Sequence, residues 1–309
     1  MEAFIQNFFT VATQVIVLFV LIAVGFVMGK RGIMGESGAK ICSDIALLVA
    51  TPCVIANSFR RECTPEVLTG LLLSMGAALL VHGINIAVAH IVYRGKSDRD
   101  AVLRLGTVLS NAGFMALPLQ QAILGNDGVF YGAAYVVVFN LVLWSYGQMT
   151  MDRDAALSFK KVVFNPGVIG LLMGVVILLV PYDLPTVVSA PLSHLAALNT
   201  PIPMLFIGYY LSKVDFKTAL KDPVYWGGSA VRLLVVPIVA TAVLYLVGVR
   251  GVLLTAMSIA STAPVAAGVA MFATRYGRDT QTAVNLVALS TVLSLVTMPI
   301  LVALTQIIA

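Results

Sequence analysis

The feature that most constrains this chain is the recurrence of apolar runs about 20 residues long, the length that a helix needs to cross a bilayer. Only 11% of the 309 residues are charged, whereas a soluble domain carries roughly 25%. The predicted spans are residues 8–29, 38–58, 67–93, 101–124, 128–150, 165–181, 190–212, 223–247, 251–274 and 280–308. The sequence therefore predicts an all-α membrane protein with ten transmembrane helices.

The remaining polar residues exclude several classes of function. Cys42, Cys53 and Cys63 have no paired spacing, so we expect no disulfide framework, no metal site and no cofactor. The sequence contains neither a phosphate-binding loop nor a nucleophile next to a base, so no motif indicates an enzyme. The net charge is +5, but the basic residues are scattered over short loops and form no continuous basic patch in the sequence. This distribution argues against nucleic acid as a partner.

The basic residues predict the orientation of the chain. With the N-terminus outside, the inner loops hold fifteen Lys and Arg residues and the outer loops hold three. The outer three are Arg60, Arg61 and Arg250. Because loops rich in Lys and Arg stay on the cytoplasmic side, we expect both termini on the periplasmic side of a bacterial inner membrane.

The two halves of the chain resemble each other at an offset of about 150 residues. We predict a five-helix repeat over 1–150, a cytoplasmic loop over 151–164 and a second five-helix repeat over 165–309. An odd number of spans per repeat gives the halves opposite orientations, which is the plan of many secondary transporters. The aligned pairs are 43–52 with 193–201, 101–119 with 251–269, and Gly125 and Asp127 with Gly277 and Asp279.

Helices 4 and 9 occupy equivalent positions in the two repeats, and both combine proline, glycine and small polar residues halfway along the span. A broken helix presents free N–H groups at a positive dipole end, which can hold an anion without a basic side chain. A packing kink is the alternative, because proline and glycine are common in membrane helices. The substrate-site candidates are Asn111, Ala112, Gly113 and Pro118 in helix 4, and Ser261, Thr262, Pro264 and Gly268 in helix 9.

Two further polar residues lie within spans. Arg232 lies about ten residues into helix 8, where an unpaired charge is costly. It either attracts an anionic substrate or holds its helix against carbonyl groups exposed by the break in helix 4, and we favour the structural role. Asn140 is a candidate substrate contact, and interhelical hydrogen bonding is its alternative role.

Helices 2 and 7 carry matched prolines. Thr51, Pro52 and Asn57 are therefore candidates for the scaffold side of the same cavity, with a structural bend as the alternative. Histidine in water titrates near physiological pH, and His82 lies in helix 3. Asp44 is the one acidic residue that falls within a predicted span, in the first turns of helix 2, where complementing the helix dipole is its alternative role. These two residues are the candidates for proton coupling.

These segments resemble the auxin efflux carrier family, which includes plant PIN-type carriers and bacterial permeases described for malate and malonate. The resemblance covers essentially the whole chain. It implies that helices 1, 2, 6 and 7 form a scaffold and a homodimer interface, and that helices 3–5 and 8–10 form a transport body. Helices 4 and 9 would cross at the substrate site, and the transport body would move in elevator fashion. The motifs are "NAGFMALPL" from Asn111, "AVRLLVVP" at 230–237, "RGVLL" at 250–254, "FATRY" at 272–276, "NP" at 165–166, and Trp144 with Asn140.

The chain also departs from the family pattern. Val269 stands where the family has a second proline in helix 9, and helix 3 lacks the Asp and Lys that plant carriers place near their site. Auxin is therefore not the expected substrate. We expect a carrier of small carboxylates such as malonate or malate, with protons or sodium as candidate coupling ions. The alternative is a cation/proton exchanger of similar inverted-repeat architecture.

Overall fold

The structure, a computed structural model, describes residues 2–152, 165–180 and 184–309, and its regular elements there are helices. Six helical stretches in these residues are long and apolar enough to cross a bilayer. They are Glu2–Lys30, Glu36–Ser58, Pro65–Val92, Ala112–Met151, Pro223–Leu246 and Thr280–Ile308, and two shorter apolar helices are Pro166–Leu179 and Gly251–Thr262. The chain is therefore an all-helical membrane protein. Most of the predicted loop 151–164 lies outside the described residues.

Four of the predicted spans coincide with uninterrupted helices. They are α1 (Glu2–Lys30), α4 (Pro65–Val92), α9 (Pro166–Leu179) and α17 (Thr280–Ile308). Each has large apolar side chains exposed on its outer face, for example Leu72 on α4, Val176 on α9 and Val296 on α17. A helix satisfies its own backbone hydrogen bonds, so such a face can contact lipid.

The other predicted spans are built from shorter helical pieces, including π-helical turns labelled η. The first-half pieces are α2 (Glu36–Ile45), η1 (Ala46–Ala50), α3 (Thr51–Ser58), α5 (Asp98–Val108), η2 (Ala112–Ala116), α6 (Leu117–Val142), η3 (Leu143–Gly147) and α7 (Gln148–Met151). The second-half pieces are α10 (Thr186–Ala197), α11 (Pro201–Ser212), α13 (Pro223–Ala230), η4 (Val231–Val235), α14 (Val236–Leu246), α15 (Gly251–Thr262) and α16 (Gly268–Arg275).

Proline explains where three of the π-helical turns form. The turns η1, η2 and η4 each end two residues before a proline, namely Pro52, Pro118 and Pro237. Proline has no N–H group and its ring clashes with the carbonyl four residues earlier. A locally widened turn relieves this clash while the helix continues. At Pro52 and Pro237 the helix therefore continues through the proline, whereas helix 7 is interrupted at residues 198–200, directly before Pro201.

Glycine makes the sharp turns that join helices 4 to 5 and 9 to 10. Gly125 has φ +64° and ψ −150° inside α6, so α6 consists of two helices joined there. Gly277 has φ +61° between α16 and α17. L-residues rarely adopt these conformations, so glycine is required. The two turns follow the two broken segments at matched positions in the halves.

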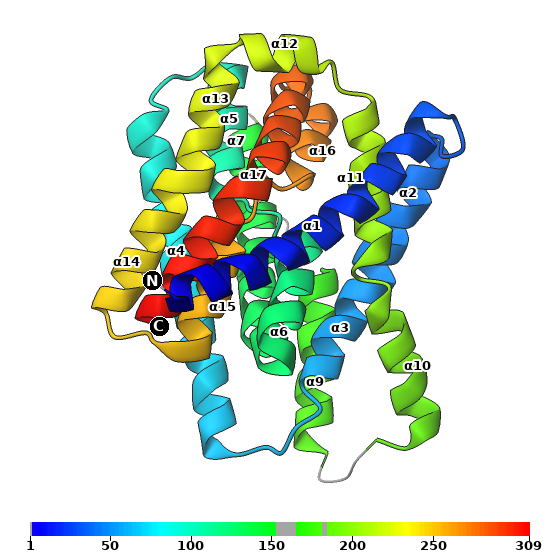
Figure 1. Cartoon of the computed structure of the whole chain (residues 1–309), viewed down its shortest axis with the longest axis vertical. Helices are drawn as coiled ribbons and strands as arrows, with labels where there is room; N and C mark the ends of the chain where they lie inside the picture. The colour runs from blue at the N-terminus through cyan, green and yellow to red at the C-terminus, as the bar shows by residue number, and fades with distance from the viewer. Residues whose placement is uncertain (1, 153–164, 181–183) are drawn as a thin grey trace.

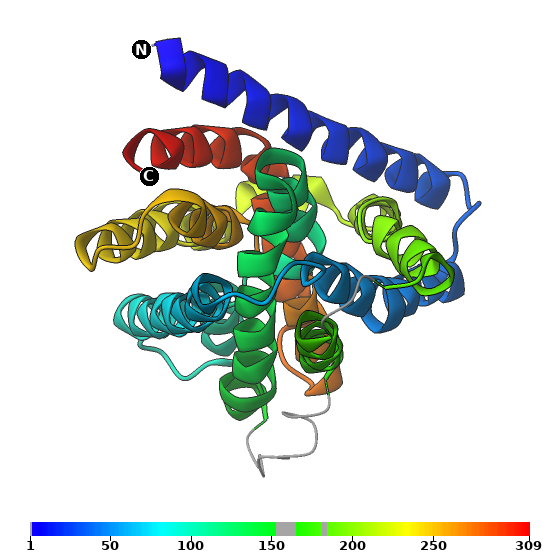
Figure 2. The same ribbon diagram turned by 90° about the horizontal axis from the view of Figure 1, so that it is seen from below.

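The helices form two groups on either side of α6 (Figures 1 and 2). One group holds α2, α3, α10 and α11, and the other holds α4, α13, α14 and α15. The short helix α12 (Phe216–Lys221) lies across the upper end in Figure 1 and links α11 to α13. The sequence did not predict α12, because six residues with two lysines carry no span-length apolar signal.

Helices α1 and α11 pack so closely that glycine is needed where they meet. A Cβ on Gly25 would lie 2.2 Å from the Leu205 carbonyl oxygen, and one on Gly208 would lie 2.0 Å from the Ile22 carbonyl oxygen. Small residues allow this approach in membranes, where van der Waals packing supplies much of the attraction between helices. The α1–α11 pair is thus a tightly packed part of the fold.

Candidate functional site

The two broken segments meet backbone to backbone. Ser110 and Val265 form an antiparallel β-bridge. The Asn111 amide donates to the Pro264 carbonyl oxygen at 2.7 Å, and the Ala266 amide donates to the Leu109 carbonyl oxygen at 3.0 Å. Residues 109–111 and 263–267 interrupt helices 4 and 9, and the structure brings these two interruptions together. We call this point the crossing.

Arg232 satisfies carbonyl groups that both breaks leave exposed. Its Nη1 donates to the Thr107 oxygen at 2.9 Å, near the end of α5. Its Nη2 donates to the Ser261 oxygen at 2.6 Å and its Nε to the Ala263 oxygen at 3.2 Å, at the end of α15. The side chain has no solvent exposure. A cation at two helix C-termini also offsets their negative dipole ends. These contacts correspond to the structural role considered for Arg232, and they extend to both breaks.

A buried polar cluster lies behind the crossing, on α4 and α6. Asn85 donates from Nδ2 to the Val108 oxygen at 3.2 Å. The Ser110 hydroxyl donates to the Tyr135 hydroxyl at 3.3 Å, and the Tyr135 ring packs against the His82 ring in a tilted arrangement with centroids 4.6 Å apart. His82 Nδ1 bonds the Ala78 oxygen at 2.8 Å, whereas His82 Nε2 and Asn85 Oδ1 have no hydrogen-bond partner in the described residues. His82 therefore lies next to the crossing.

The helices that begin at the crossing have open space beside a glycine in their first turn. A Cβ built on Gly113 in η2, or on Gly268 at the start of α16, would meet no atom within 4 Å. Within the described residues, the amide groups of Gly113 and Gly268 have no hydrogen-bond acceptor, and the Asn111 side chain makes no hydrogen bond. Two positive helix ends and the side-chain amide of Asn111 therefore lie next to the crossing without hydrogen-bond partners among the described residues.

The remaining candidates of the two broken helices are buried. Ala112 and Pro118 are buried in helix 4, and Thr262 and Pro264 are buried in helix 9. The Thr262 hydroxyl donates to the Ile259 oxygen at 3.0 Å within its own helix. The Ser261 hydroxyl is buried without a hydrogen-bond partner in the described residues.

Asn199 is a residue that the sequence interpretation missed. Its Oδ1 accepts from the Thr51 hydroxyl at 2.9 Å, and its Nδ2 donates to the Gly113 oxygen at 3.4 Å. It lies between α10 and α11, so it links the break in helix 7 and Thr51 of helix 2 to Gly113, which is next to the crossing. The sequence signal that could have identified Asn199 is an amide side chain directly before Thr200 and Pro201 in an apolar run.

The other scaffold candidates lie elsewhere. Pro52 packs against α9, where a Cβ on Gly170 would lie 2.8 Å from the Pro52 Cα. Asn57 Oδ1 accepts from Arg60 at 3.3 Å and from Ser193 at 3.4 Å, at the far end of α3. Of the three candidates, Thr51 alone is connected to the neighbourhood of the crossing by hydrogen bonds seen in the described residues, through Asn199 to Gly113.

Two candidates have no hydrogen bond to the crossing in the described residues. Asn140 donates to the Val136 oxygen at 2.8 Å in its own helix, and its Nδ2 lies 2.8 Å from where a Cβ of Gly167 on α9 would be. Asp44 lies in the last turn of α2 on an exposed face. No group of three or more His, Cys, Asp or Glu that could hold a metal occurs in the described part of the chain.

A cavity of about 170 Å³ adjoins this region between α1 and α6. Its polar lining is Gln14 from α1, Gln121 from α6 and Thr200, and Pro118 contributes to the same wall. The sequence interpretation missed both glutamines. The broken helix 4 therefore borders a space with hydrogen-bonding groups.

A family model described as a membrane transport protein matches residues 10–302. The chain belongs to this family. It is the family of the auxin efflux carriers, so the resemblance noted from the motifs is confirmed. Family membership makes the chain a membrane transport protein, integral to the membrane, rather than an enzyme.

Two curated relatives are similar over almost their whole length. An uncharacterized transporter of Methanothermobacter thermautotrophicus is 24% identical over 293 residues, covering 93% of this chain and 95% of the relative. An uncharacterized transporter of Methanocaldococcus jannaschii is 23% identical over 295 residues, covering 91% of this chain and 94% of the relative. Both names agree with membrane transport.

Proposed function

We propose that the protein carries small organic acid anions, such as malonate or malate, across the membrane. The observation that supports this best is the crossing. Two helical segments begin there at Ala112 and Gly268, with open space beside Gly113 and Gly268, and the side-chain amide of Asn111 makes no hydrogen bond in the described residues. N-terminal helix ends favour negative charge. An amide can bind a carboxylate without fixing a charge in the membrane.

The electrostatic balance at the crossing favours an anion over a cation. The C-terminal ends of α5 and α15, which would attract a cation, are already occupied by the guanidinium of Arg232. The two N-terminal ends have no such partner among the described residues. A bound carboxylate would complete the hydrogen bonding of these free amide groups.

The proposed mechanism is elevator-type alternating access. All ten predicted spans contain helix and would cross the membrane as two inverted five-helix repeats. The scaffold would be α1–α3 and α9–α11, and the transport body would be α4–α7 and α13–α17. The transport body would shift against the scaffold and carry the crossing from one side to the other.

The proposed setting follows from charge and from the family. Both termini would face the periplasm of a bacterial inner membrane, and a homodimer would form through helices 1, 2, 6 and 7. Protons or sodium would drive accumulation. Auxin is not proposed as the substrate, because α4 has neither Asp nor Lys.

The test is uptake of radiolabelled mono- and dicarboxylates into proteoliposomes, with and without imposed proton or sodium gradients. We expect accumulation or counterflow of at least one carboxylate. Asn111→Ala should lower uptake strongly, while Asn57→Ala, at the far end of α3, should leave it near the wild-type rate. No accumulation and no counterflow of any carboxylate would refute the proposal.

A cation/proton exchanger is the second candidate, and the partnerless Nε2 of buried His82 is the observation that favours it. An exchanger needs a titrating group inside the membrane, and His82 or Asp44 would have to supply it. Proton flux driven by a cation gradient, abolished by His82→Gln or Asp44→Asn but unaffected by Asn111→Ala, would favour the exchanger.

A further inference from the structure

One side chain ties the far end of α3 to the turn that joins helices 4 and 5. Arg61 donates from Nη1 to Asp127 at 2.7 Å and from Nη2 to the Asn126 oxygen at 3.1 Å. Its Nε donates to the Ser58 oxygen at 3.0 Å, so the guanidinium is fixed to α3 while it holds the turn. In the orientation that the basic loops predict, this contact lies on the outer side.

An aromatic pair lies directly beneath Arg61. Phe59, which ends α3, packs on Phe130 of α6 with ring centroids 4.8 Å apart, and these rings are 0% and 1% exposed. The Arg61 guanidinium covers the Phe130 ring at 4.3 Å. A Cβ on Gly174 of α9 would lie 2.6 Å from Phe59, so Phe59 fills the space between α9 and α6. The outer ends of α3 and α6 are thus closed by packed apolar rings under a salt bridge.

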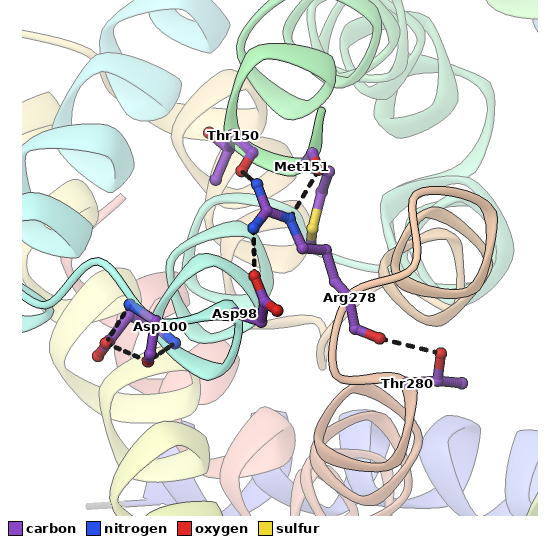
Figure 3. Close-up of polar contacts among 7 residues, drawn as sticks. Asp98, Asp100, Thr150, Met151, Arg278 and Thr280 are labelled. Carbon is purple, nitrogen blue, oxygen red and sulfur yellow. Dashed lines mark hydrogen bonds and ion pairs between the residues drawn. The ribbon is translucent and has the colours of Figure 1, made fainter. Parts of the chain in front are cut away.

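The matched turn at the opposite end of the molecule is held differently. Arg278, which follows Gly277, pairs with Asp98 of α5 and donates to the Met151 oxygen at 2.7 Å and the Thr150 oxygen at 3.5 Å (Figure 3). These partners belong to α5 and α7, which are parts of the proposed transport body. Among the described residues, no ion pair joins this turn to α1–α3 or α9–α11.

We propose that Arg61 and the Phe59–Phe130 pair form an outer latch. The latch holds the transport body against the scaffold in the inward-facing state and opens each time the transport body moves outward. This rests on the elevator mechanism proposed above. Of the two matched turns, only the outer one is tied to the scaffold within the described residues, so the structure corresponds to the state that is closed on the outside.

The strength of the contact suits a latch that opens in every cycle. The Arg61 and Asp127 side chains are 20% and 63% exposed, so water screens the ion pair. An ion pair screened by water is weak, and the single cation–π contact on the buried Phe130 ring adds a modest contribution. Losing both should raise the population of the outward-facing state by about fivefold.

The test measures the distance between the scaffold and the transport body by pulsed electron spin resonance. Spin labels at Val187→Cys on α10 and Leu246→Cys on α14 sit on side chains that are 85% and 80% exposed. The three native cysteines are replaced by serine. Arg61→Ala should enrich the outward-facing distance about fivefold, and Asp127→Ala, which keeps the contact of Arg61 with Phe130, should enrich it less. The charge-reversed pair Arg61→Asp with Asp127→Arg should shift the distances less than Arg61→Ala, because it restores the ion pair but not the contact with Phe130.

Arg60→Ala is the matched control. Arg60 is the neighbouring cation, but it bonds to Asn57 and Ser193, which both belong to the scaffold. Its removal should leave the distances unchanged. The latch is overturned if Arg61→Ala shifts nothing, or if Arg60→Ala shifts the distances equally. If Arg61→Ala shifts the distances as expected but the protein transports no carboxylate, the proposed substrate is refuted and the latch is still supported.

Discussion

The main-chain amide of Asn111 donates a 2.7 Å hydrogen bond to the carbonyl oxygen of Pro264. These residues are the matched interruptions of helices 4 and 9, so the two halves of the chain complete each other's backbone hydrogen bonding at the point where each is broken. A broken helix in a membrane is tolerated where it is buried in protein or lines a cavity. The crossing meets this condition, because its C-terminal helix ends are buried against Arg232 and open space lies beside Gly113 and Gly268.

Replacing Arg232 should destabilise the protein. Lysine keeps the charge but has a single donor nitrogen, so it cannot reach the carbonyl groups of Thr107, Ser261 and Ala263 together. Each buried carbonyl left without a partner costs about 1–3 kcal/mol. We expect Arg232→Lys to lower the stability in detergent by at least about 2 kcal/mol, measured by thermal unfolding. Arg250→Lys, at an exposed arginine, should change it little.

Changing Asn111 should affect transport more than stability, because its side chain makes no hydrogen bond in the described residues. A hydrogen bond to a charged group contributes roughly 1.5–3 kcal/mol. Asn111→Ala should therefore lower carboxylate affinity by about tenfold or more, and Asn111→Asp should abolish uptake through like-charge repulsion. Uptake kinetics in proteoliposomes check both. Wild-type uptake by Asn111→Asp would contradict an anion site at this position.

The two glycine turns should not tolerate a side chain. Gly125→Ala should cost about 1–3 kcal/mol, because φ +64° with ψ −150° is a region almost restricted to glycine. Gly277→Ala should cost about 1 kcal/mol at φ +61°. Gly76→Ala is the control, since this helical glycine has open space around it and should be neutral or slightly stabilised. Thermal unfolding of the three variants gives the comparison.

Acid should weaken the junction between α12 and α13. The hydrogen bond from the Val224 amide, and then the one from Arg99, lower the pKa of Asp222 below its ordinary value. A lowered folded-state pKa stabilises the fold above the unfolded-state value of about 3.9, and this contribution is lost as the pH falls through the folded-state pKa. Unfolding curves at stepped pH should show a decline below about pH 4.

The Asp222→Asn variant should flatten this decline in stability. Asp44→Asn, at an exposed carboxylate on α2, should leave it unchanged. An identical acid decline in the wild type and in Asp222→Asn would show that Asp222 does not contribute to it.

The sequence located the breaks but not the environment of each polar side chain. Asn111 and Gly268 could be chosen because proline and glycine stand beside small polar residues at matched positions. Asn57 and Asn140 came from similar patterns, yet their amides bond near the far end of α3 and within α6. A short apolar run does not show which side of its helix faces a neighbour. For the same reason Asn199, Gln14 and Gln121 were missed.

The positions of the helices and of their interruptions were determined by the sequence itself, because both depend on local chemistry. A run of about 20 apolar residues forms a spanning helix, and a proline without an N–H group distorts the turn before it. Which groups meet was decided by the tertiary structure alone. Arg232 bonds carbonyl groups 29, 31 and 125 positions away, and Arg61 bonds Asp127 66 positions away. Such partners depend on how distant helices pack against one another, and no local pattern encodes them.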